Sequence, residues 1–339
     1  MKICAFETSC DDTAVAIVED GVKILADVCL SQVEHAKWGG VVPELAAREH
    51  AEKWPTVLQE ALNSAGLTFE DIDAIAVTKG PGLSPALLSG TTAASFLSLF
   101  ENKPLIPVHH IFAHTCAVFC ERDLSTVRFP ALVITASGGH TAMNFWRNYT
   151  DLQLLGNTRD DAVGEVFDKV AKKLGLKYPG GPEVSRCAKD GDETAFAFPR
   201  IFLEKYSLDF SFSGLKSAVF RAIESLESVG EKDIANICAS FEKAVADTFI
   251  KKAIRATNEH PETEDIVFVG GVSANTKLRE ELQAFAKESG RRLIIPKEIK
   301  YSTDNAAMVA SAAYLLWKEN PEIAQVQFVD ADARMVINN

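Results

Sequence analysis

Two short sequence patterns each occur twice in this chain, and in the same order. The segment SCDDTA (residues 9–14) has Ser, Thr and Ala at the same spacing as SGGHTA (residues 137–142). The segments IAVTKGPG (75–82) and IVFVGGVS (266–273) are each an apolar run that enters a glycine turn. Two matches in one order indicate a duplicated structural unit, whereas a single match arises easily by chance. Two unrelated α/β domains are the alternative interpretation.

The length of the chain also favours two units. At 339 residues it exceeds the roughly 250 residues at which a single core usually stops growing. We therefore expect an N-terminal lobe over residues 1–128 and a C-terminal lobe over residues 129–339, with a cleft between them.

Each half is expected to open with three short strands and to continue with alternating helices and strands, which predicts an α/β fold. The expected strands are residues 2–7, 13–19, 22–30, 73–79, 104–110, 129–137, 141–148, 151–157, 265–271 and 291–296. The expected helices are residues 43–64, 160–176, 213–228, 233–258, 275–289 and 304–318, one that ends near residue 100 and one that carries His114.

This duplicated plan resembles the actin-like, sugar-kinase and Hsp70 ATPase (ASKHA) superfold. The resemblance implies that the strand–turn–strand hairpins of the two lobes face each other across a nucleotide in an interlobe cleft. Asp11 lies in the first hairpin and the Ser137–Gly139 turn in the second, where small residues leave backbone N–H groups able to cradle phosphate oxygens. Asn275 follows the turn GGVSA at a helix start, from which its amide can reach a sugar or base.

The composition indicates a soluble protein of a reducing compartment, and we expect it in the cytoplasm. No apolar run reaches the ~20 residues of a membrane span, and the N-terminus does not resemble a signal peptide. The seven cysteines contain no CxxC pair, which argues against disulfides and against a cysteine zinc site.

The net charge of −12 opposes long-range attraction to nucleic acid. An RNA substrate would have to meet a helper protein or a local basic patch. The candidate patches are Lys172, Lys173 and Lys177; Lys251, Lys252 and Arg255; and Arg291, Arg292, Lys297 and Lys300.

His110 and His114 are spaced four residues apart, as two metal ligands on one helix face often are. An HxxxH pair alone also arises from ordinary helix-face histidines. A metalloprotease of the HExxH type requires a glutamate after the first histidine, and that position holds Ile111. We therefore set the protease interpretation aside.

Asp304, in the segment STDNAAM, can complete a two-histidine, one-carboxylate metal site. The alternative is that Asp304 caps the last helix, since Asp is among the best N-cap residues. The predicted fold brings Asp304 to the histidines, because the last helix of the second lobe returns to the cleft.

The stretch DDAVGEVFDKVAKKLGLKYPGGP (160–182) combines an acidic helix start with a Pro-Gly-Gly-Pro turn. Asp168 is either a ligand-facing acid or a solvated helix charge. Gly181 would let backbone approach a ribose closely, although turn geometry explains this glycine equally well.

Several long motifs together resemble the TsaD family of bacterial tRNA N6-adenosine threonylcarbamoyltransferases. The resemblance covers nearly the whole chain. The motifs are FETSCDDTAVAI (6–17), HAKWGGVVPELAAREH (35–50), VTKGPGL (77–83), HHIFAH (109–114), SGGHT (137–141), residues 160–182, DFSFSGLKSAV (209–219), GGVSAN (270–275) and STDNAAM (302–308).

The resemblance implies transfer of the threonylcarbamoyl group from threonylcarbamoyl-AMP to N6 of adenosine 37 in tRNAs that read ANN codons. It implies that His110, His114 and Asp304 hold one Fe²⁺ or Zn²⁺ and that Asp11 acts near the reacting group. The adenylate, or ATP or AMP in its place, would be bound by Thr135, Ala136, Ser137, Gly138, Gly139, Asp168, Gly181 and Asn275. The implied partners are tRNA, a TsaB-type paralogue on the N-terminal lobe and a TsaE-type ATPase.

One departure bears on the ligand site: Ser185 stands where many relatives carry an Asp that contacts the ligand. Two alternatives to the transferase are an ATP-binding scaffold of a tRNA-modification complex and a sugar kinase. The HxxxH pair argues against the kinase, since phosphoryl transfer to a sugar does not require it. The presence of all three expected metal ligands argues against an inert scaffold.

Overall fold

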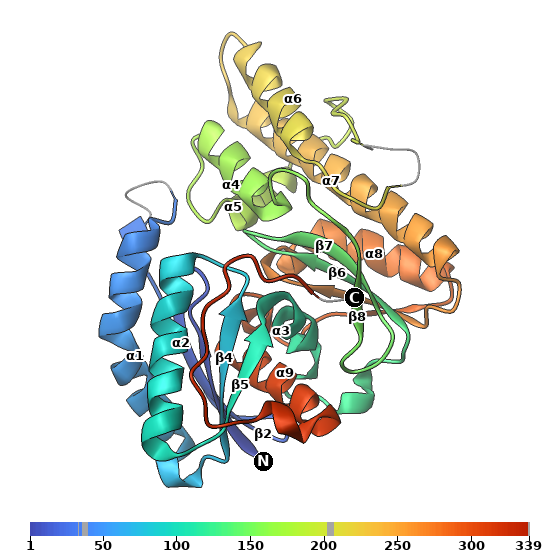
Figure 1. Ribbon diagram of the computed structural model, residues 1–339. Helices are drawn as coiled ribbons and strands as arrows, with labels where there is room; N and C mark the ends of the chain where they lie inside the picture. The colour runs from blue at the N-terminus through green and yellow to red at the C-terminus, as the bar shows by residue number, and fades with distance from the viewer. Residues whose placement is uncertain (33, 36–39, 202–206, 338–339) are drawn as a thin grey trace. The chain divides into compact units, whose positions relative to one another are not determined.

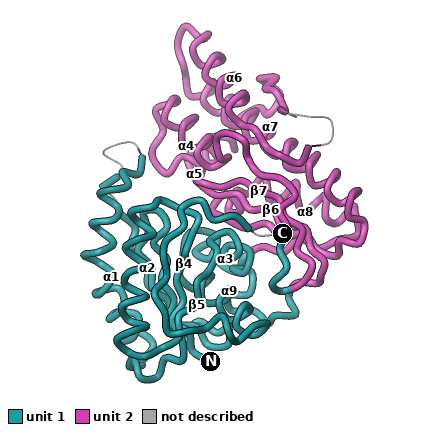
Figure 2. Tube along the Cα trace, viewed as in Figure 1, with its two compact units in different colours: residues 1–126, 149–152, 296–339 teal, residues 127–148, 153–295 magenta. Residues whose placement is uncertain are grey.

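The computed structural model describes residues 1–32, 34–35, 40–201 and 207–337. The described chain forms two compact units, shown in different colours in Figure 2. Unit 1 contains residues 1–126, 149–152 and 296–339, and unit 2 contains residues 127–148 and 153–295. Part of the motif at 35–50, residues 36–39, lies outside the described residues.

Unit 1 is built on a five-stranded sheet of order β3-β2-β1-β4-β5. Its strands are β1 (Lys2–Glu7), β2 (Asp12–Glu19), β3 (Lys23–Ser31), β4 (Ala74–Gly80) and β5 (Leu105–His109). The first three form an antiparallel meander, and β4 and β5 extend it in parallel. The expected Asp-Gly turn joins β2 to β3, with left-handed φ angles of 52° at Asp20 and 71° at Gly21.

Helices cover both faces of this sheet (Figure 1). Helices α1 (Pro43–Ala65) and α2 (Ser84–Glu101) lie on one face, and α3 (His110–Cys116) and α9 (Ala306–Glu319) lie on the other. Strands β1, β2 and β4 are almost wholly buried because both faces are covered. The core between the sheet and α1 includes Phe6, Val15, Ile17 and Val57.

Unit 2 repeats the same sheet topology: from the edge strand of its meander, the order is β8-β7-β6-β9-β10. Its strands are β6 (Ala131–Ala136), β7 (Thr141–Trp146), β8 (Leu152–Asn157), β9 (Asp265–Val269) and β10 (Arg292–Ile294). Its helices are α4 (Val163–Lys173), α5 (Gly180–Ala188), α6 (Ser213–Glu224), α7 (Glu231–Glu259) and α8 (Thr276–Glu288). The two sheets therefore correspond strand for strand, which confirms the duplicated α/β fold predicted from the repeated patterns.

The structure differs from the predicted lobe division at the C-terminus. Residues 296–339 belong to unit 1 rather than to a lobe spanning 129–339. Helix α9 packs on β1, β2 and α3, and the chain after it donates backbone hydrogen bonds to unit 1, as from Val329 N to Ser95 Oγ at 3.0 Å. The physical reason is that α9 buries an almost entirely apolar surface against β1 and β2 of the first sheet.

A second difference concerns residues 179–182, which were expected to form a turn. They open helix α5, with Pro179 at its N-cap and Pro182 in its first turn, where proline is tolerated. Gly180 is required at this point, because a Cβ there would lie 2.6 Å from the Asp168 Cα of α4.

Within the described ranges, no helix combines the length and apolar character that a membrane span requires.

Candidate functional site

The two histidines of the HxxxH pair lie on α3, directly after β5. His109 ends the strand and caps the helix, since its Nδ1 accepts a hydrogen bond from the Ile111 N–H at 3.1 Å. His110 and His114 follow at the first and fifth helical positions and are 3% and 0% exposed. Their ring centroids lie 4.6 Å apart, so one helix face presents both imidazoles to the same point.

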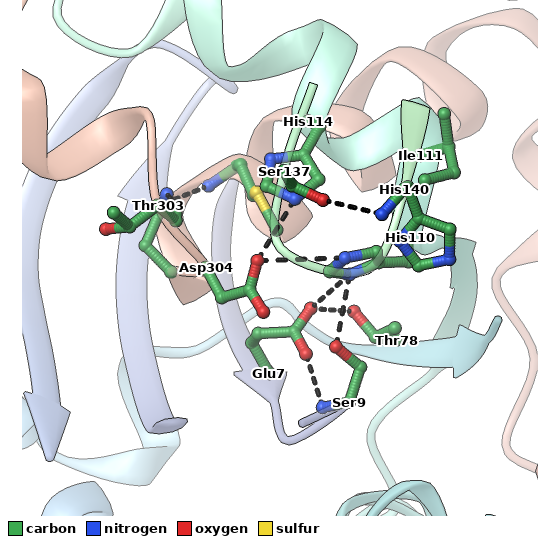
Figure 3. A network of polar contacts seen from close by, with 12 residues as sticks. Glu7, Ser9, Thr78, His110, Ile111, His114, Ser137, His140, Thr303 and Asp304 are labelled. Carbon is green, nitrogen blue, oxygen red and sulfur yellow. Dashed lines mark hydrogen bonds and ion pairs between the residues drawn. The ribbon is translucent and has the colours of Figure 1, made fainter. Parts of the chain in front are cut away.

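Asp304 reaches these rings from the segment that precedes α9, and all three residues belong to unit 1 (Figure 3). Its Oδ1 lies 3.0 Å from His114 Nε2 and 3.7 Å from His110 Nε2. One ligand atom from each of the three residues lies within 4.8 Å of the others. The structure thus brings together the three residues expected to bind a metal.

The N-cap alternative for Asp304 is wrong. The N-cap of α9 is Asn305, whose Oδ1 accepts a hydrogen bond from Met308 N–H at 2.8 Å. The Asp304 carboxylate is therefore not used to terminate the helix and can face the histidines.

The bonding of His114 tests whether the three residues fit a metal ion. Both of its ring nitrogens are buried, and neither makes a properly directed hydrogen bond to any described residue, although Nε2 lies 3.0 Å from Asp304. A buried nitrogen without a hydrogen bond is costly, and a cation on Nε2 removes that cost for one of the two. Two imidazoles and one carboxylate suit Fe²⁺ or Zn²⁺. The residues present therefore fit the ion.

Glu7, at the end of β1, is a site residue that sequence reasoning missed. It is fully buried, and its Oε2 lies 3.1 Å from His110 Nδ1 and accepts a hydrogen bond from Thr78 Oγ1 at 2.7 Å. Its Oε1 accepts the Ser9 N–H at 2.5 Å. Because the carboxylate occupies Nδ1 of His110, Nε2 is the nitrogen that faces Asp304. An acidic residue closing the apolar strand KICAFE is the signal that could have identified Glu7.

The charges of this cluster shift the pKa values of its members. Burial would raise the pKa of Glu7, but the charge and hydrogen bond of His110 and the Thr78 hydroxyl hold it below its usual value. Burial would lower the pKa of His110, but the charges of Glu7 and Asp304 raise it above its usual value. The pocket is thus strongly negative and stabilises a positive charge near His110.

Asp11 lies in the turn between β1 and β2, as expected. Its carbonyl oxygen accepts a hydrogen bond from the Gln32 N–H at 3.1 Å. No hydrogen bond or ion pair within the described chain joins Asp11 to the three metal-type ligands. Its side chain is thus not fixed by the histidine cluster.

The residues expected to bind the adenylate all belong to unit 2. Thr135 and Ala136 end β6, and Ser137, Gly138 and Gly139 form the turn that follows. Ser137 closes this turn, since its N–H donates to the His140 carbonyl at 2.8 Å and its Oγ accepts the His140 N–H at 3.1 Å. A Cβ on either Gly138 or Gly139 would meet nothing within 4 Å, so the backbone of the turn is open to a ligand.

Asp168 and Gly181 are brought together where α4 meets the start of α5. The Asp168 Oδ1 accepts the Gly180 N–H at 2.7 Å, which places the carboxylate at the N-terminus of α5. A Cβ on Gly181, the next residue, would also meet nothing within 4 Å.

Asn275 has its side chain committed to protein contacts. Its Oδ1 caps α8 by accepting Leu278 N–H at 3.0 Å, and its Nδ2 donates to Glu242 Oε1 at 2.6 Å and to Ser185 Oγ at 2.8 Å. Ser185 in turn donates to Glu242 Oε1 at 2.5 Å. Burial raises the pKa of Glu242, although hydrogen bonds from Ser185 and Asn275 oppose this. Glu242 was also missed at the sequence level.

The candidate basic patches are largely engaged in the fold. Lys252 is 1% exposed and donates to the Ser207 carbonyl at 3.2 Å, so its assignment to a surface patch is wrong. Lys173 pairs with Glu224 at 2.6 Å, Arg292 with Asp265 at 2.6 Å and Lys297 with Glu121 at 3.2 Å. These pairs weaken the case for direct RNA binding by those residues.

Fold and site together define the class: a protein of the duplicated actin-like ATPase fold with a histidine–histidine–aspartate cluster in its first unit. HypF of T. kodakarensis matches 95% of this chain and 49% of its own with a TM-score of 0.63 at 14% identity. Component A of (R)-2-hydroxyglutaryl-CoA dehydratase from Acidaminococcus fermentans matches 93% of this chain and 96% of its own with a TM-score of 0.51 at 18% identity. Likeness at these identities concerns the fold alone.

Sequence comparison then identifies the family. Residues 23–311 match the family TsaD, tRNA N6-adenosine threonylcarbamoyltransferase. The enzyme of that name from Staphylococcus saprophyticus is 46% identical over 318 residues, covering 93% of this chain and 91% of the relative. That from Moorella thermoacetica is 46% identical over 315 residues, covering 92% and 91%. The chain belongs to the TsaD family.

Proposed function

We propose that this chain is an acyltransferase that moves the threonylcarbamoyl group of threonylcarbamoyl-AMP to N6 of adenosine 37 in tRNAs reading ANN codons. The products are threonylcarbamoyladenosine (t6A) in the tRNA and AMP. The observation that carries the proposal is the convergence of His110, His114 and Asp304 in a chain 46% identical to transferases of this name.

The reaction forms a bond between N6 and the carbamoyl carbon and breaks the bond from that carbon to the phosphate oxygen. The electron pair of the broken bond leaves with AMP, and one N6 proton passes to a base. We assign the base to the Asp11 carboxylate, which the histidine cluster does not bind. Adenine N6 is a weak nucleophile, so its placement against the carbamoyl carbon supplies much of the rate. The adenine ring of adenosine 37 must also leave its stack in the anticodon loop.

The adenylate is assigned to unit 2. The open backbone of Ser137, Gly138 and Gly139 offers N–H donors to phosphate oxygens. Asp168 and Gly181 at the start of α5 suit the ribose, because a carboxylate accepts from ribose hydroxyls and Gly181 permits close approach. Asn275 is assigned a supporting role on the same ligand, through the contacts that fix Ser185 and Glu242.

One divalent cation, Fe²⁺ or Zn²⁺, is assigned to His110, His114 and Asp304. When bound, such an ion supplies Lewis-acid polarisation of a carbonyl or phosphate oxygen. Glu7 orients His110, and the burial of both histidines keeps water from their coordinating nitrogens.

A TsaB-type paralogue is assigned to the outer surface of α1 and α2. Leu88, Phe96, Leu99 and Phe100 of α2 are 54%, 57%, 56% and 72% exposed, and Phe96 and Phe100 stack at 5.6 Å. Ala47, Ala51 and Trp54 of α1 line a groove with Pro85, Leu88 and Phe96. A contiguous apolar stripe beside a groove suits helices of a partner.

The substitution Phe96→Ser tests this surface. It should abolish co-elution of this chain with the paralogue and leave the melting temperature of the variant within a few degrees of wild type.

We further propose tRNA and a TsaE-type ATPase as partners, acting in the cytoplasm where tRNA is modified. The net charge of −12 and the engaged basic residues indicate that partner chains supply much of the attraction to tRNA.

The test is a reconstituted assay with threonylcarbamoyl-AMP, unmodified tRNA and both partners, comparing wild type with His110→Ala. His260→Ala, which removes a histidine from unit 2, is the matched control. We expect t6A from wild type and the control and a loss of about 100-fold or more in His110→Ala. Equal yield from wild type and His110→Ala would exclude the metal-centred site, and no yield from any of them would favour an ATP-binding scaffold.

A further inference from the structure

His50, on α1, makes a set of buried contacts that no step above uses. Its side chain is fully buried. Its Nε2 lies 3.0 Å from the carbonyl oxygen of Cys10, and its Nδ1 lies 2.7 Å from Thr13 Oγ1. These two contacts tie α1 to both ends of the turn that carries Asp11.

The partners of His50 determine where its proton lies. A carbonyl oxygen can only accept, so Nε2 carries the hydrogen that is donated to Cys10. Thr13 Oγ1 and Gln32 Nε2, the latter at 3.3 Å, both have a hydrogen to donate to Nδ1. The arrangement therefore requires a neutral imidazole with Nδ1 as acceptor.

The same donor-to-acceptor direction continues in the hydrogen bonds from Gln32 to a second histidine. Gln32 Nε2 also donates to the Ala46 carbonyl at 3.2 Å, which identifies it as the amide nitrogen. Gln32 Oε1 accepts from His35 Nε2 at 2.7 Å, and His35 Nδ1 accepts from the Val42 N–H at 3.3 Å. Every donor in this series of hydrogen bonds meets an acceptor when the His50 and His35 rings are both neutral.

The charged groups around His50 do not overturn this assignment. Burial lowers the pKa of His50, and this effect outweighs the Cys10 hydrogen bond and the charges of Glu7 and Asp11, which raise it. His35 is the other titratable group that acts on it, and it lowers the pKa further.

The hydrogen bond to Cys10 orients the next residue. A trans peptide is planar with its C=O and N–H pointing in opposite directions. Since the Cys10 carbonyl points at His50, the Asp11 N–H points away from α1. This N–H makes no hydrogen bond to any residue in the described ranges, while the Asp11 carbonyl accepts from Gln32 N–H at 3.1 Å.

We propose that His50 is a positioning residue for the transfer reaction: it fixes the Cys10–Asp11 peptide so that the Asp11 N–H is presented to an oxygen of the acyl adenylate and its carboxylate to the attacking amine. The proposal rests on the proposed function for its substrate, whereas the contacts of His50 with Cys10, Thr13 and Gln32 all lie within unit 1. A preorganised N–H toward an oxygen that gains charge in the transition state raises kcat more than it lowers KM.

The test compares three variants in the reconstituted assay. His50→Leu removes the donor to Cys10, and His50→Gln retains an amide donor of similar reach. Thr13→Val removes the other contact of His50 but leaves the Cys10 bond. We expect His50→Leu to lose about 100-fold in kcat with KM for tRNA nearly unchanged. His50→Gln should recover to within about tenfold of wild type and Thr13→Val to within about threefold.

Equal losses of kcat in folded His50→Leu and Thr13→Val would show a structural role only and overturn the proposal. Nitrogen NMR of the histidine rings in wild type tests which His50 nitrogen carries the proton, and this test does not depend on activity. We expect the His50 proton on Nε2 at pH 7 and a shifted Asp11 amide resonance in His50→Leu, which lacks the donor to Cys10. A proton on Nδ1, or a doubly protonated ring, would overturn the positioning role. Absence of transfer by wild type with the expected NMR result would instead reject the proposed function.

Discussion

Glu7 and His110 are both buried, and the Glu7 carboxylate lies 3.1 Å from His110 Nδ1. This contact leaves Nε2 of His110 facing Asp304 and increases the basicity of the ring. The carboxylate also accepts from Thr78 Oγ1 and Ser9 N–H, so three donors surround it. An amide in its place would offer one acceptor oxygen and set its NH₂ group against a donor.

We therefore expect Glu7→Gln to weaken metal binding by about 10- to 100-fold. Competition with a chromophoric chelator measures this affinity without recourse to enzyme activity. Glu242→Gln is the matched control, because it neutralises a buried carboxylate in unit 2. Equal metal affinities for Glu7→Gln and wild type would show that Glu7 does not support His110.

The unbonded nitrogens of His114 predict a stability effect that changes sign with metal. In the presence of a chelator, His114→Leu should be at least as stable as wild type, because leucine removes two buried nitrogens without hydrogen bonds. Burying such a polar group costs about 1–3 kcal/mol. With Zn²⁺ at about 100 times its Kd, wild type should gain about 2.7 kcal/mol and the variant nothing. Urea unfolding under both conditions measures the difference, and a metal-independent ranking would contradict the site.

Gly180 and Gly181 are adjacent but should respond oppositely to alanine. A Cβ on Gly180 would lie 2.6 Å from Asp168 Cα and 2.9 Å from the Phe167 carbonyl. These are backbone atoms, so relieving the clash would require helix α4 or the start of α5 to shift. We expect Gly180→Ala to lose about 1–3 kcal/mol of stability. Gly181→Ala meets nothing within 4 Å and should be neutral or gain about 0.5–1 kcal/mol as a helical alanine.

The same pair also tests the ligand site. Gly181→Ala should weaken AMP binding measured by calorimetry despite its unimpaired stability, because its Cβ occupies the space assigned to the ribose. Unchanged AMP affinity in Gly181→Ala would remove Gly181 from the site.

The sequence was most informative where structure is set by local pattern. The Asp20–Gly21 turn, the meanders and the long helices follow from apolar periodicity and turn residues, which act over a few positions. The start of α5 was missed because glycine and proline normally break helices. The need for Gly180 comes from its close approach to Phe167, Asp168 and Ala171 of α4, which no local pattern reports.

The site was predicted less completely because its contacts are distant in sequence. Glu7 meets Thr78 and His110 across 71 and 103 positions, so no local pattern reports its role. The cap of α9 falls on Asn305 rather than Asp304, a one-residue distinction that propensity does not resolve because both residue types cap well. The placement of α9 in unit 1 likewise depends on packing between segments far apart in the chain.

Asp265, at the start of β9, predicts how stability depends on acid pH. It is fully buried and binds Arg128 and Arg292 at 2.8 and 2.6 Å. Burial would raise its pKa, but hydrogen bonds from Arg292 and Arg128 hold the pKa below the usual value of 3.8. The unfolded chain therefore takes up a proton at higher pH than the folded protein does. The stabilisation is full above about pH 4 and is lost as pH falls through the folded pKa.

Asp265→Asn should lose about 1–3 kcal/mol at pH 7, a moderate value because both arginines are nearly half exposed and regain water. The deficit relative to wild type should shrink as pH falls from 4 toward 2, because wild type then loses the charge as well. Urea unfolding of both proteins at pH 7, 4 and 3 measures this difference. A deficit that grows with acidification would mean that the carboxyl group is already protonated in the folded protein at neutral pH.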